Sequence, residues 1–361
     1  MSNRNIINDL AQKWDCDRMA MVIERIPNQI EIALDHTMPS LSKGTFNKVL
    51  LVGMGGSALP MDIVIDAFAD QLKIRPAILR NYQLPSWVDD KTLIIASSFS
   101  GSTEEVMMAI KHFPKKASNI VVICRELKDD KDESALNSMA NERGYPLIEI
   151  PVNKEPPGFQ PRSAVGYMVT FLARLLSDAG VLEDSTSQLQ TIPPFLRRKL
   201  EIRTGAEDVA QWLVDKIPII YTDESHLNSV ARVAKIKFNE NSKRPAFFNA
   251  LPEVNHNEMI GFTKSFGRFG VLYVHDSDSH PRIRHRFNVM KQVFEKTNFL
   301  NHVSFWEWEM IGETKLQKIF SALVFVDWCS YTLALLDKIN PTPVELVEIF
   351  KKNLGSEDIS N

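Results

Sequence analysis

The sequence predicts an α/β protein built from two doubly wound parallel-sheet domains, with helical extensions at both ends of the chain. The first observation behind this prediction is length, because 361 residues exceed one typical domain and suit two of ordinary size. The second is a regular alternation of short apolar runs with helical patterns, which is typical of parallel strands covered by helices on both faces. The alternation occurs in both halves of the chain, so we expect whole domains to be repeated.

The first 45 residues are expected to be helical, since apolar side chains such as Ile6, Leu10 and Trp14 recur at helical spacing. The first sheet domain then covers residues 46–152. Its expected strands are the apolar runs Lys48–Val52, Ala77–Leu79, Thr92–Ala96, Ile120–Cys124 and Leu147–Ile150. Its expected helices start at Leu59 and cover Glu104–Phe113 and Asp129–Arg143.

Residues 153–200 interrupt this alternation with a proline-rich stretch, a mixed helix and a polar stretch, and we expect them to connect the domains. The second sheet domain covers residues 201–340. Its expected strands are Ile217–Thr222, Phe247–Leu251, Gly270–His275 and Val303–Glu309. Its expected helices are Leu227–Phe238, His285–Lys296 and a long helix from Glu313. Two prolines end that helix, and residues 341–361 form a short amphipathic helix, Val344–Leu354, and a polar tail.

The charge balance disfavours nucleic acid or a membrane surface as a partner. The chain carries 42 Lys and Arg against 45 Asp and Glu, without a long block of one sign. The three cysteines, Cys16, Cys124 and Cys329, lie far apart and fit neither a disulfide framework nor paired metal ligands. Since the N-terminus also lacks the apolar core of a secretory signal, we expect a reduced, cytosolic protein.

One segment, Ile319–Leu336, is long and apolar enough to be considered as a membrane span. Asp327 lies in the middle of it, where a charge costs about 2.5 to 3.5 kcal/mol on insertion. A long helix buried in a soluble α/β core explains the same run without that cost. We therefore expect a core helix.

A glycine-rich loop, Gly53–Leu59, follows the first expected strand. Glycines let a backbone approach a ligand closely, and a helix that opens at Ser57 would present free amides to an anion. The loop also satisfies a loose dinucleotide fingerprint, which requires an acidic residue after the next strand. Arg80 occupies that neighbourhood instead. An arginine could accept the 2'-phosphate of a dinucleotide, so a dinucleotide site is weakened rather than removed.

A hydroxyl-rich loop, Ser97–Glu105, follows the strand Thr92–Ala96 and contains several side chains that can bind an anion. These side chains are Ser98, Ser100, Ser102 and Thr103. Hydroxyls next to the amides of a helix start form a neutral cradle for a dianion such as a monophosphate. The alternative is ordinary helix capping by Ser102 and Glu105, which needs only one of these hydroxyls.

The stretch Lys235–Phe262 contains a carboxylate, Glu240, and an imidazole, His256, between two apolar segments. These are the side chains most often tuned for proton transfer near neutral pH, so we expect proton-transfer chemistry. The alternative is that Glu240 lies on a solvated helix end and His256 in a polar turn.

A further cluster of histidines and aspartates, residues 275–285, contains His275, Asp276, Asp278, His280 and His285. It spans a strand end and Pro281 without the fixed spacing of ligands on a helix. We expect a polar loop there and no metal requirement.

The loops Met54–Ser57 and Ser98–Thr103, each after a strand, resemble those of the sugar isomerase (SIS) domain. From residue 46 to 354 the chain is similar to the bifunctional phosphoglucose/phosphomannose isomerases, a branch of the phosphoglucose isomerase superfamily with two such domains. Four further motifs occur in the family's order: Pro161-Arg162-Ser163, Asn239-Glu240-Asn241, His256-Asn257-Glu258 and Asn340-Pro341-Thr342-Pro343-Val344.

The resemblance implies roles for individual residues. The substrate phosphate would be held by Gly55, Gly56, Ser57, Ser98, Ser100 and Thr103. Glu240 would move a proton between C2 and C1, and Arg162 would stabilise the enediolate between them. His256 would assist ring opening from the neighbouring subunit of a homodimer. Lys351, or the adjacent Lys352, would serve the same step. Thr342 would correspond to a threonine that is linked with accepting both C2 epimers.

The activity that the resemblance implies is interconversion of glucose 6-phosphate and mannose 6-phosphate with fructose 6-phosphate, without cofactor or metal. A non-catalytic sugar-phosphate sensor that uses the same cradle is the alternative, and a dinucleotide-dependent oxidoreductase is a weaker third. A sensor is expected to carry a DNA-binding helical module. The first 45 residues are neither basic nor long enough for that role.

Overall fold

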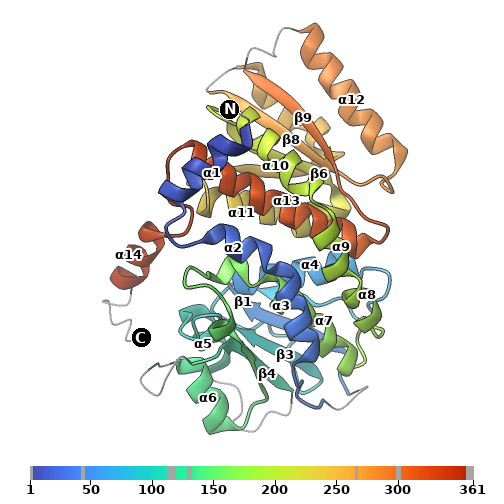
Figure 1. Cartoon of the computed structure of the whole chain (residues 1–361). Helices are drawn as coiled ribbons and strands as arrows, with labels where there is room; N and C mark the ends of the chain where they lie inside the picture. The colour runs from blue at the N-terminus through green and yellow to red at the C-terminus, as the bar shows by residue number, and fades with distance from the viewer. Residues whose placement is uncertain are drawn as a thin grey trace.

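The computed structural model describes residues 3–41, 45–111, 119–127, 132, 134–264, 267–297 and 302–354. Within this part of the chain, two parallel sheets account for all the named strands, one with five strands and one with four. The long helix α13 (Lys315–Leu336) crosses between the two sheets in Figure 1. The prediction of an α/β fold with two parallel sheets is therefore confirmed.

The first sheet has the strand order β2-β1-β3-β4-β5. Its strands are β1 (Lys48–Gly53), β2 (Ala77–Leu79), β3 (Thr92–Ser97), β4 (Ile120–Arg125) and β5 (Leu147–Ile150). The strand order reverses at β1, and crevices at such switch points are the usual ligand sites of doubly wound sheets. The ladder pairs Gly53 of β1 with Ser97 of β3, so the glycine-rich and hydroxyl-rich loops leave the sheet side by side.

The second sheet has the order β7-β6-β8-β9. Its strands are β6 (Ile217–Asp223), β7 (Phe247–Leu251), β8 (Phe269–His275) and β9 (Val303–Glu309). A π-helical turn, Leu227–Ala231, precedes α11 (Arg232–Glu240), where the sequence predicts one continuous helix. Helix α12, between β8 and β9, runs from Pro281 to Lys296 and so starts four residues before the predicted His285.

Ten α-helices of the described residues precede the second sheet in the chain. They are α1 (Asn3–Trp14), α2 (Met19–Glu24), α3 (Ile26–Asp35), α4 (Leu59–Ala67), α5 (Glu104–Lys111), α6 (Ala135–Arg143), α7 (Val165–Asp178), α8 (Thr186–Gln190), α9 (Ile192–Arg198) and α10 (Glu201–Trp212). The predicted helix starts at Glu104 and Leu59 are confirmed. The predicted helix Asp129–Arg143 begins only at Ala135, and residues 112–118, 128–131 and 133 lie outside the described part.

Helices α8, α9 and α10 are not predicted from the sequence. The first two are short and lie in a polar stretch with adjacent prolines, so they lack the long apolar periodicity that marks a helix. Helix α10 packs against α13 and buries Ile202, Ala206 and Val209. The start of the second domain therefore supplies a helix to the core between the sheets.

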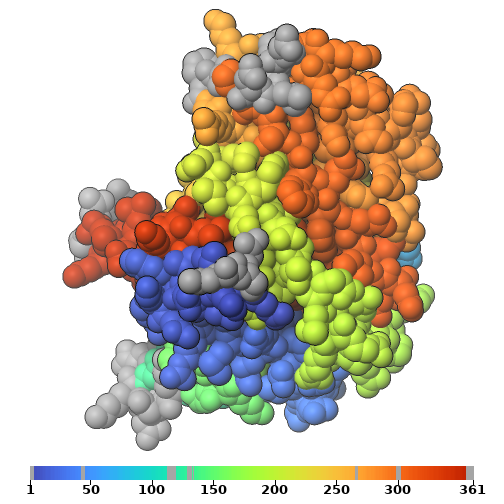
Figure 2. All heavy atoms as spheres, turned by 45° about the horizontal axis from the view of Figure 1, so that its top comes forward, coloured from blue at the N-terminus to red at the C-terminus, as the bar shows by residue number. Residues whose placement is uncertain are grey.

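Helix α13 is long and apolar enough to span a membrane, but 89% of its apolar window is buried inside the protein. This burial confirms the expectation of a core helix. The following helix, α14 (Glu345–Leu354), differs from α13 in its exposure, because none of its residues is buried. Leu346 and Phe350 are 81% and 64% exposed, and Figure 2 shows the red C-terminal segment projecting from one side of the body.

Candidate active site

The two polar loops of the first sheet are joined by a hydrogen bond. The amide of Phe99 donates to Ser57 Oγ at 3.0 Å, which ties the glycine-rich loop to the hydroxyl-rich loop. Within the second loop, Ser98 Oγ and Thr103 Oγ1 lie 2.7 Å apart. Three of the predicted cradle hydroxyls, those of Ser57, Ser98 and Thr103, are therefore gathered at the switch point of the sheet.

The tip of the hydroxyl-rich loop is shaped by a tight turn. Gly101 has φ 71°, and a Cβ there would lie 1.8 Å from Ser134 Oγ, so only glycine fits. Ser100 Oγ accepts from the amide of Ser102 at 3.3 Å. Because α5 begins at Glu104, Ser102 lies outside the helix, and its hydroxyl is within 3.3 Å of Ser100 instead. Ser102 therefore does not hold the position directly before the helix that the capping alternative assigns to it.

The cradle lies directly against the turn that carries Arg162. A Cβ added to Gly56 would lie 2.9 Å from the carbonyl carbon of Pro161 and 3.0 Å from the amide nitrogen of Arg162. Glycine at this position therefore lets the phosphate loop and the arginine turn touch. It links the cradle, formed by the first sheet, to groups that come from the rest of the chain.

Arg162 is the most constrained charged side chain of the site, with 5% of its surface exposed. Its Nε donates to Asn241 Oδ1 at 2.7 Å, and Nη2 donates to the carbonyls of Pro341 at 3.0 Å and Thr342 at 2.8 Å. Burial lowers the pKa of Arg162, and the Glu240 and Asp327 carboxylates act in the opposite direction. An arginine keeps its charge at neutral pH in such a setting, so the guanidinium is a fixed cation.

Glu240 is the last residue of α11, and its carboxylate faces Arg162. Glu240 Oε2 lies 3.3 Å from Arg162 Nη1, while about a third of the Glu240 side chain, 33%, stays exposed. One carboxylate thus has a buried cation on one side and open surface on the other. Such a group can accept a proton from a bound molecule while the cation stabilises negative charge next to it.

Lys243 is a site residue that the sequence reasoning missed. Its Nζ donates to the carbonyl of Glu240 and, at 3.0 Å, to that of Pro341. Lys243 has φ 56°, a left-handed conformation that turns the chain back after α11. Burial and then the charge of Arg162 lower its pKa to about 8, against the opposing effect of Glu240 and Glu345. Its position three residues after Glu240 was the only available signal.

His256 is not brought to Glu240 within one chain. Glu240 ends the helix that returns to the start of β7, whereas His256 follows the end of β7, so Glu240 lies toward the amino ends of the strands and His256 at their carboxyl ends. The five residues of β7 correspond to roughly 16 Å. The simple hypothesis of a Glu240 and His256 pair acting within one molecule is therefore disfavoured by the topology.

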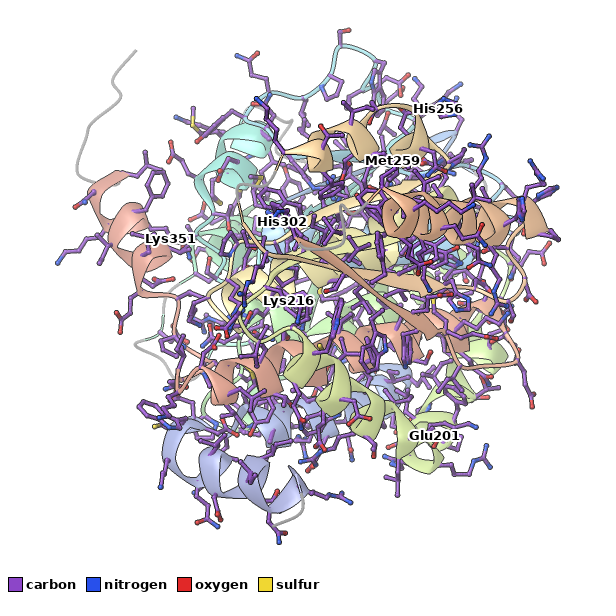
Figure 3. The ribbon with its side chains drawn as sticks, turned by 90° about the horizontal axis from the view of Figure 1, so that it is seen from above. Glu201, Lys216, His256, Met259, His302 and Lys351 are labelled. Carbon is purple, nitrogen blue, oxygen red and sulfur yellow. The ribbon has the colours of Figure 1, made fainter. Side chains whose placement is uncertain are left out.

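Lys351 also lies away from these groups, on the exposed helix α14. Its side chain is 61% exposed, and Nζ pairs with Glu348 Oε1 at 3.1 Å. Figure 3 shows Lys351 and His256 on different sides of the molecule. Contacts within one chain therefore join the cradle, Arg162 and Glu240, whereas Lys351 pairs with a neighbour on its own helix and His256 lies at the other end of β7.

At the carboxyl ends of the second sheet's strands, the place that corresponds to the cradle of the first sheet, the side chains form ion pairs with one another. Lys318 Nζ lies 2.6 Å from both Asp276 Oδ1 and Asp278 Oδ2, and His226 Nε2 lies 3.0 Å from Asp276 Oδ2. These carboxylates are thus engaged with a lysine in the loop that the sequence predicts to be polar. Among the described residues, no group of three or more His, Cys, Asp or Glu is arranged to hold a metal ion.

In the first domain, Arg80 forms an ion pair with Asp62. The guanidinium that would bind the 2'-phosphate of a dinucleotide is therefore already paired.

Comparison with known proteins identifies the family. A family model described as the bacterial phospho-glucose isomerase C-terminal SIS domain matches residues 202–354. The bifunctional phosphoglucose/phosphomannose isomerase of Caldicellulosiruptor bescii is 32% identical over 92% of this chain and 98% of its own length. The chain belongs to the bifunctional phosphoglucose/phosphomannose isomerase family. It is therefore an enzyme of the sugar-phosphate isomerase class, and the sensor alternative is not supported.

Two further similarities show the breadth of this group. The D-glucosamine-6-phosphate 4-epimerase of Sulfolobus acidocaldarius is 30% identical over 72% of this chain and 78% of its own length. A solved glucose-6-phosphate isomerase from Chlamydia trachomatis superposes with a TM-score of 0.66 at 13% identity, covering 93% of this chain and 72% of that one. The chain thus shares its fold with a distant relative. It shares nearly a third of its aligned residues with an enzyme that is named for another sugar-phosphate reaction.

Because the pKa of Lys243 is about 8, we expect the activity of the enzyme to change near that pH. Above that pH the amine loses its proton, which removes positive charge beside Arg162, Glu240 and Glu345. We expect kcat/KM to fall several-fold across this range, since negative charge that develops on the substrate is then less stabilised. Lys243→Met should lower kcat/KM at pH 7 and abolish this inflection in a profile from pH 6 to 10.

Lys291→Met is the matched control, because Lys291 pairs with Glu307 on the far side of the second sheet. It should retain the inflection. A Lys243→Met profile that matches that of the parent protein would show that this amine does not influence the reaction.

Proposed function

We propose that this enzyme interconverts glucose 6-phosphate and mannose 6-phosphate with fructose 6-phosphate through an enediolate, by proton transfer without a metal. The observation that carries the proposal is the 3.3 Å contact between Arg162 Nη1 and Glu240 Oε2, next to a hydroxyl cradle. A base, a fixed cation and an anion site are the three groups that this chemistry needs. They come from separate parts of the chain and meet at one place.

In this proposal the cradle holds the phosphate of the open-chain sugar. The hydroxyls of Ser57, Ser98, Ser100 and Thr103 bind its oxygens, together with the backbone of Gly55 and Gly56. This set places a strongly charged group without lysine, so the positive charge of Arg162 remains available for the reacting carbons. Anchoring the phosphate fixes the distance from C6 to the carboxylate and brings C1 and C2 into reach.

Glu240 then removes the proton from C2 of the aldose, and the electron pair forms the enediolate between C1 and C2. Arg162 stabilises the negative charge on the oxygens. The proton returns from Glu240 to C1, and the hydroxyl proton on O2 passes to O1, which yields the ketose. No oxidant or reductant is consumed. The reverse reaction uses the same groups, and return of the proton to either face of C2 gives either epimer.

Acceptance of both epimers needs room around C2, and Thr342 is the residue that the family resemblance links with it. Its carbonyl accepts from Arg162 Nη2 at 2.8 Å, and its side chain is 4% exposed. Thr342 is thus part of the support of the cation, which is consistent with a role beside the reacting carbons. The proposal includes this role.

Ring opening must precede proton transfer, because only the open sugar has a carbonyl. We propose that His256 of a second subunit supplies this step in a homodimer, with Lys351 or Lys352 as an additional group. The support is topological, since His256 follows the carboxyl end of β7 whereas Glu240 precedes its amino end. The exposed apolar residues of α14 are consistent with a surface that is covered in an assembly. A cytosolic location completes the proposal.

An assay with EDTA and without nucleotide tests the proposed reaction. Mannose 6-phosphate and glucose 6-phosphate should each yield fructose 6-phosphate, and Glu240→Gln should lower kcat by about 10² to 10⁴-fold because a general base is lost. The melting temperature of the variant should stay close to that of the parent protein.

Absence of product from both sugars would refute the isomerase proposal. Product from one sugar alone would refute dual specificity. A product inverted at C4, as the name of the epimerase relative suggests for that protein, would assign a different reaction to the same site.

Mixing two inactive variants tests the shared site. A heterodimer of Glu240→Gln and His256→Ala subunits would contain one site with both native groups, so random pairing should restore about a quarter of native activity. Each variant alone, passed through the same subunit exchange, is the control. If the mixture stays as inactive as the separate variants, His256 does not act across the subunit boundary.

A further inference from the structure

A buried ion pair lies beneath Arg162 and takes no part in the reaction proposed above. Asp327 of α13 lies 2.5 Å from Lys237 Nζ of α11, and their side chains are only 5% and 4% exposed. Burying two charges costs free energy that their attraction offsets only in good geometry with further hydrogen bonds. The contacts of the pair should therefore show what it does for the protein.

The pair contacts the backbone of Arg162. Lys237 Nζ donates to the carbonyl oxygen of Arg162 at 2.8 Å. A cavity of about 20 Å³, lined by Gly56, Arg162, Lys237 and Asp327 among others, borders this contact. The main chain of Arg162 thus contacts Gly56 and also accepts a hydrogen bond from Lys237 next to this small cavity.

A second connection runs parallel to the first and reaches the side chain. Asn241 accepts from Arg162 Nε at 2.7 Å, and its own Nδ2 donates to Ser330 Oγ at 2.9 Å. Asn241 is the C-cap residue of α11, four positions after Lys237, and Asp327 and Ser330 are three apart on α13, so each pair shares one helix face. Groups from these two helices therefore hydrogen-bond to Arg162 at two points, its carbonyl oxygen and its Nε.

These contacts leave one nitrogen of the guanidinium for the reacting centre. Nε is held by Asn241 and Nη2 by the carbonyls of Pro341 and Thr342, whereas Nη1 faces Glu240. The orientation of Nη1 thus depends on the groups behind it. We infer that Lys237 and Asp327 are positioning residues that fix Arg162, with Asn241 and Ser330 as the second half of the same support. This inference rests on the proposed role of Arg162.

The support predicts a loss of catalysis without a loss of fold. Replacing a buried ion pair by apolar residues is often neutral for stability, so Lys237→Met combined with Asp327→Leu should stay folded. Arg162 would lose its main-chain anchor, and kcat should fall about 10- to 100-fold, the effect of a small misplacement. KM for the sugar phosphate should change less than twofold because the cradle is untouched.

A matched control joins the same two regions without touching Arg162. Arg244, just after α11, forms a two-pronged pair with Asp337 at the end of α13, at 2.7 and 2.6 Å. Arg244→Met combined with Asp337→Leu removes an ion pair of comparable geometry. If kcat falls as much in this control as in the Lys237 and Asp327 variant, the effect is general loosening and the inference is wrong.

A direct readout that does not need activity is the Arg162 Nε–H signal in a protein with ¹⁵N-labelled arginine, assigned by its loss in Arg162→Lys. We expect slow hydrogen exchange in the parent protein and exchange about tenfold faster in the double variant, since local ordering protects the group. An unchanged signal and unchanged kcat in a folded double variant would overturn the inference. If that variant does not fold, Ser330→Ala must show the same faster exchange, and failure there overturns it as well.

The two proposals remain separable in this design. A parent protein without isomerase activity would refute the proposed function, while the exchange of the Arg162 Nε–H would still decide whether the buried pair positions the arginine.

Discussion

The burial of one positive charge, that of Arg162, is the constraint around which the site is organised. A guanidinium with 5% of its surface exposed has to satisfy its donors inside the protein. It does so with groups from the end of α11 and from the turn after α13, which are distant in sequence from the short turn that carries it. The arginine can therefore be in place only when the connection and the second domain have packed together.

The same constraint explains two unusual features of the chain. The apolar helix α13 contains Asp327 because a lysine that holds the backbone of Arg162 needs a counter-charge at that depth. The glycine-rich loop has no side chain at Gly56 because the arginine turn passes within contact distance of it. The cation, the cradle and the core helix are thus parts of one packed arrangement rather than separate motifs.

The sequence predicted the sheets well, because buried parallel strands are short apolar runs bounded by polar loops. The hydroxyls of Ser57, Ser98 and Thr103, predicted as an anion cradle, do lie together in the structure, since their loops follow neighbouring strands. Glu240 was a candidate for proton transfer from its residue type, whereas Arg162 was assigned through family resemblance alone. Lys243 and the partnership of Lys237 with Asp327 were not predicted, because their importance depends on contacts with residues about 75 to 100 positions away. Asp327 could be recognised only as an anomaly in an apolar helix.

The central claim is that a carboxylate moves a carbon-bound proton beside a buried cation. The most direct measurement is the incubation of fructose 6-phosphate with the enzyme in D₂O, followed by NMR detection of deuterium at C1 and in the aldose products at C2. The account predicts incorporation of solvent deuterium over successive turnovers, slowed in Glu240→Gln by the same factor as turnover. Complete retention of the original hydrogen through many turnovers would contradict it, because a hydride shift needs neither the carboxylate nor the enediolate.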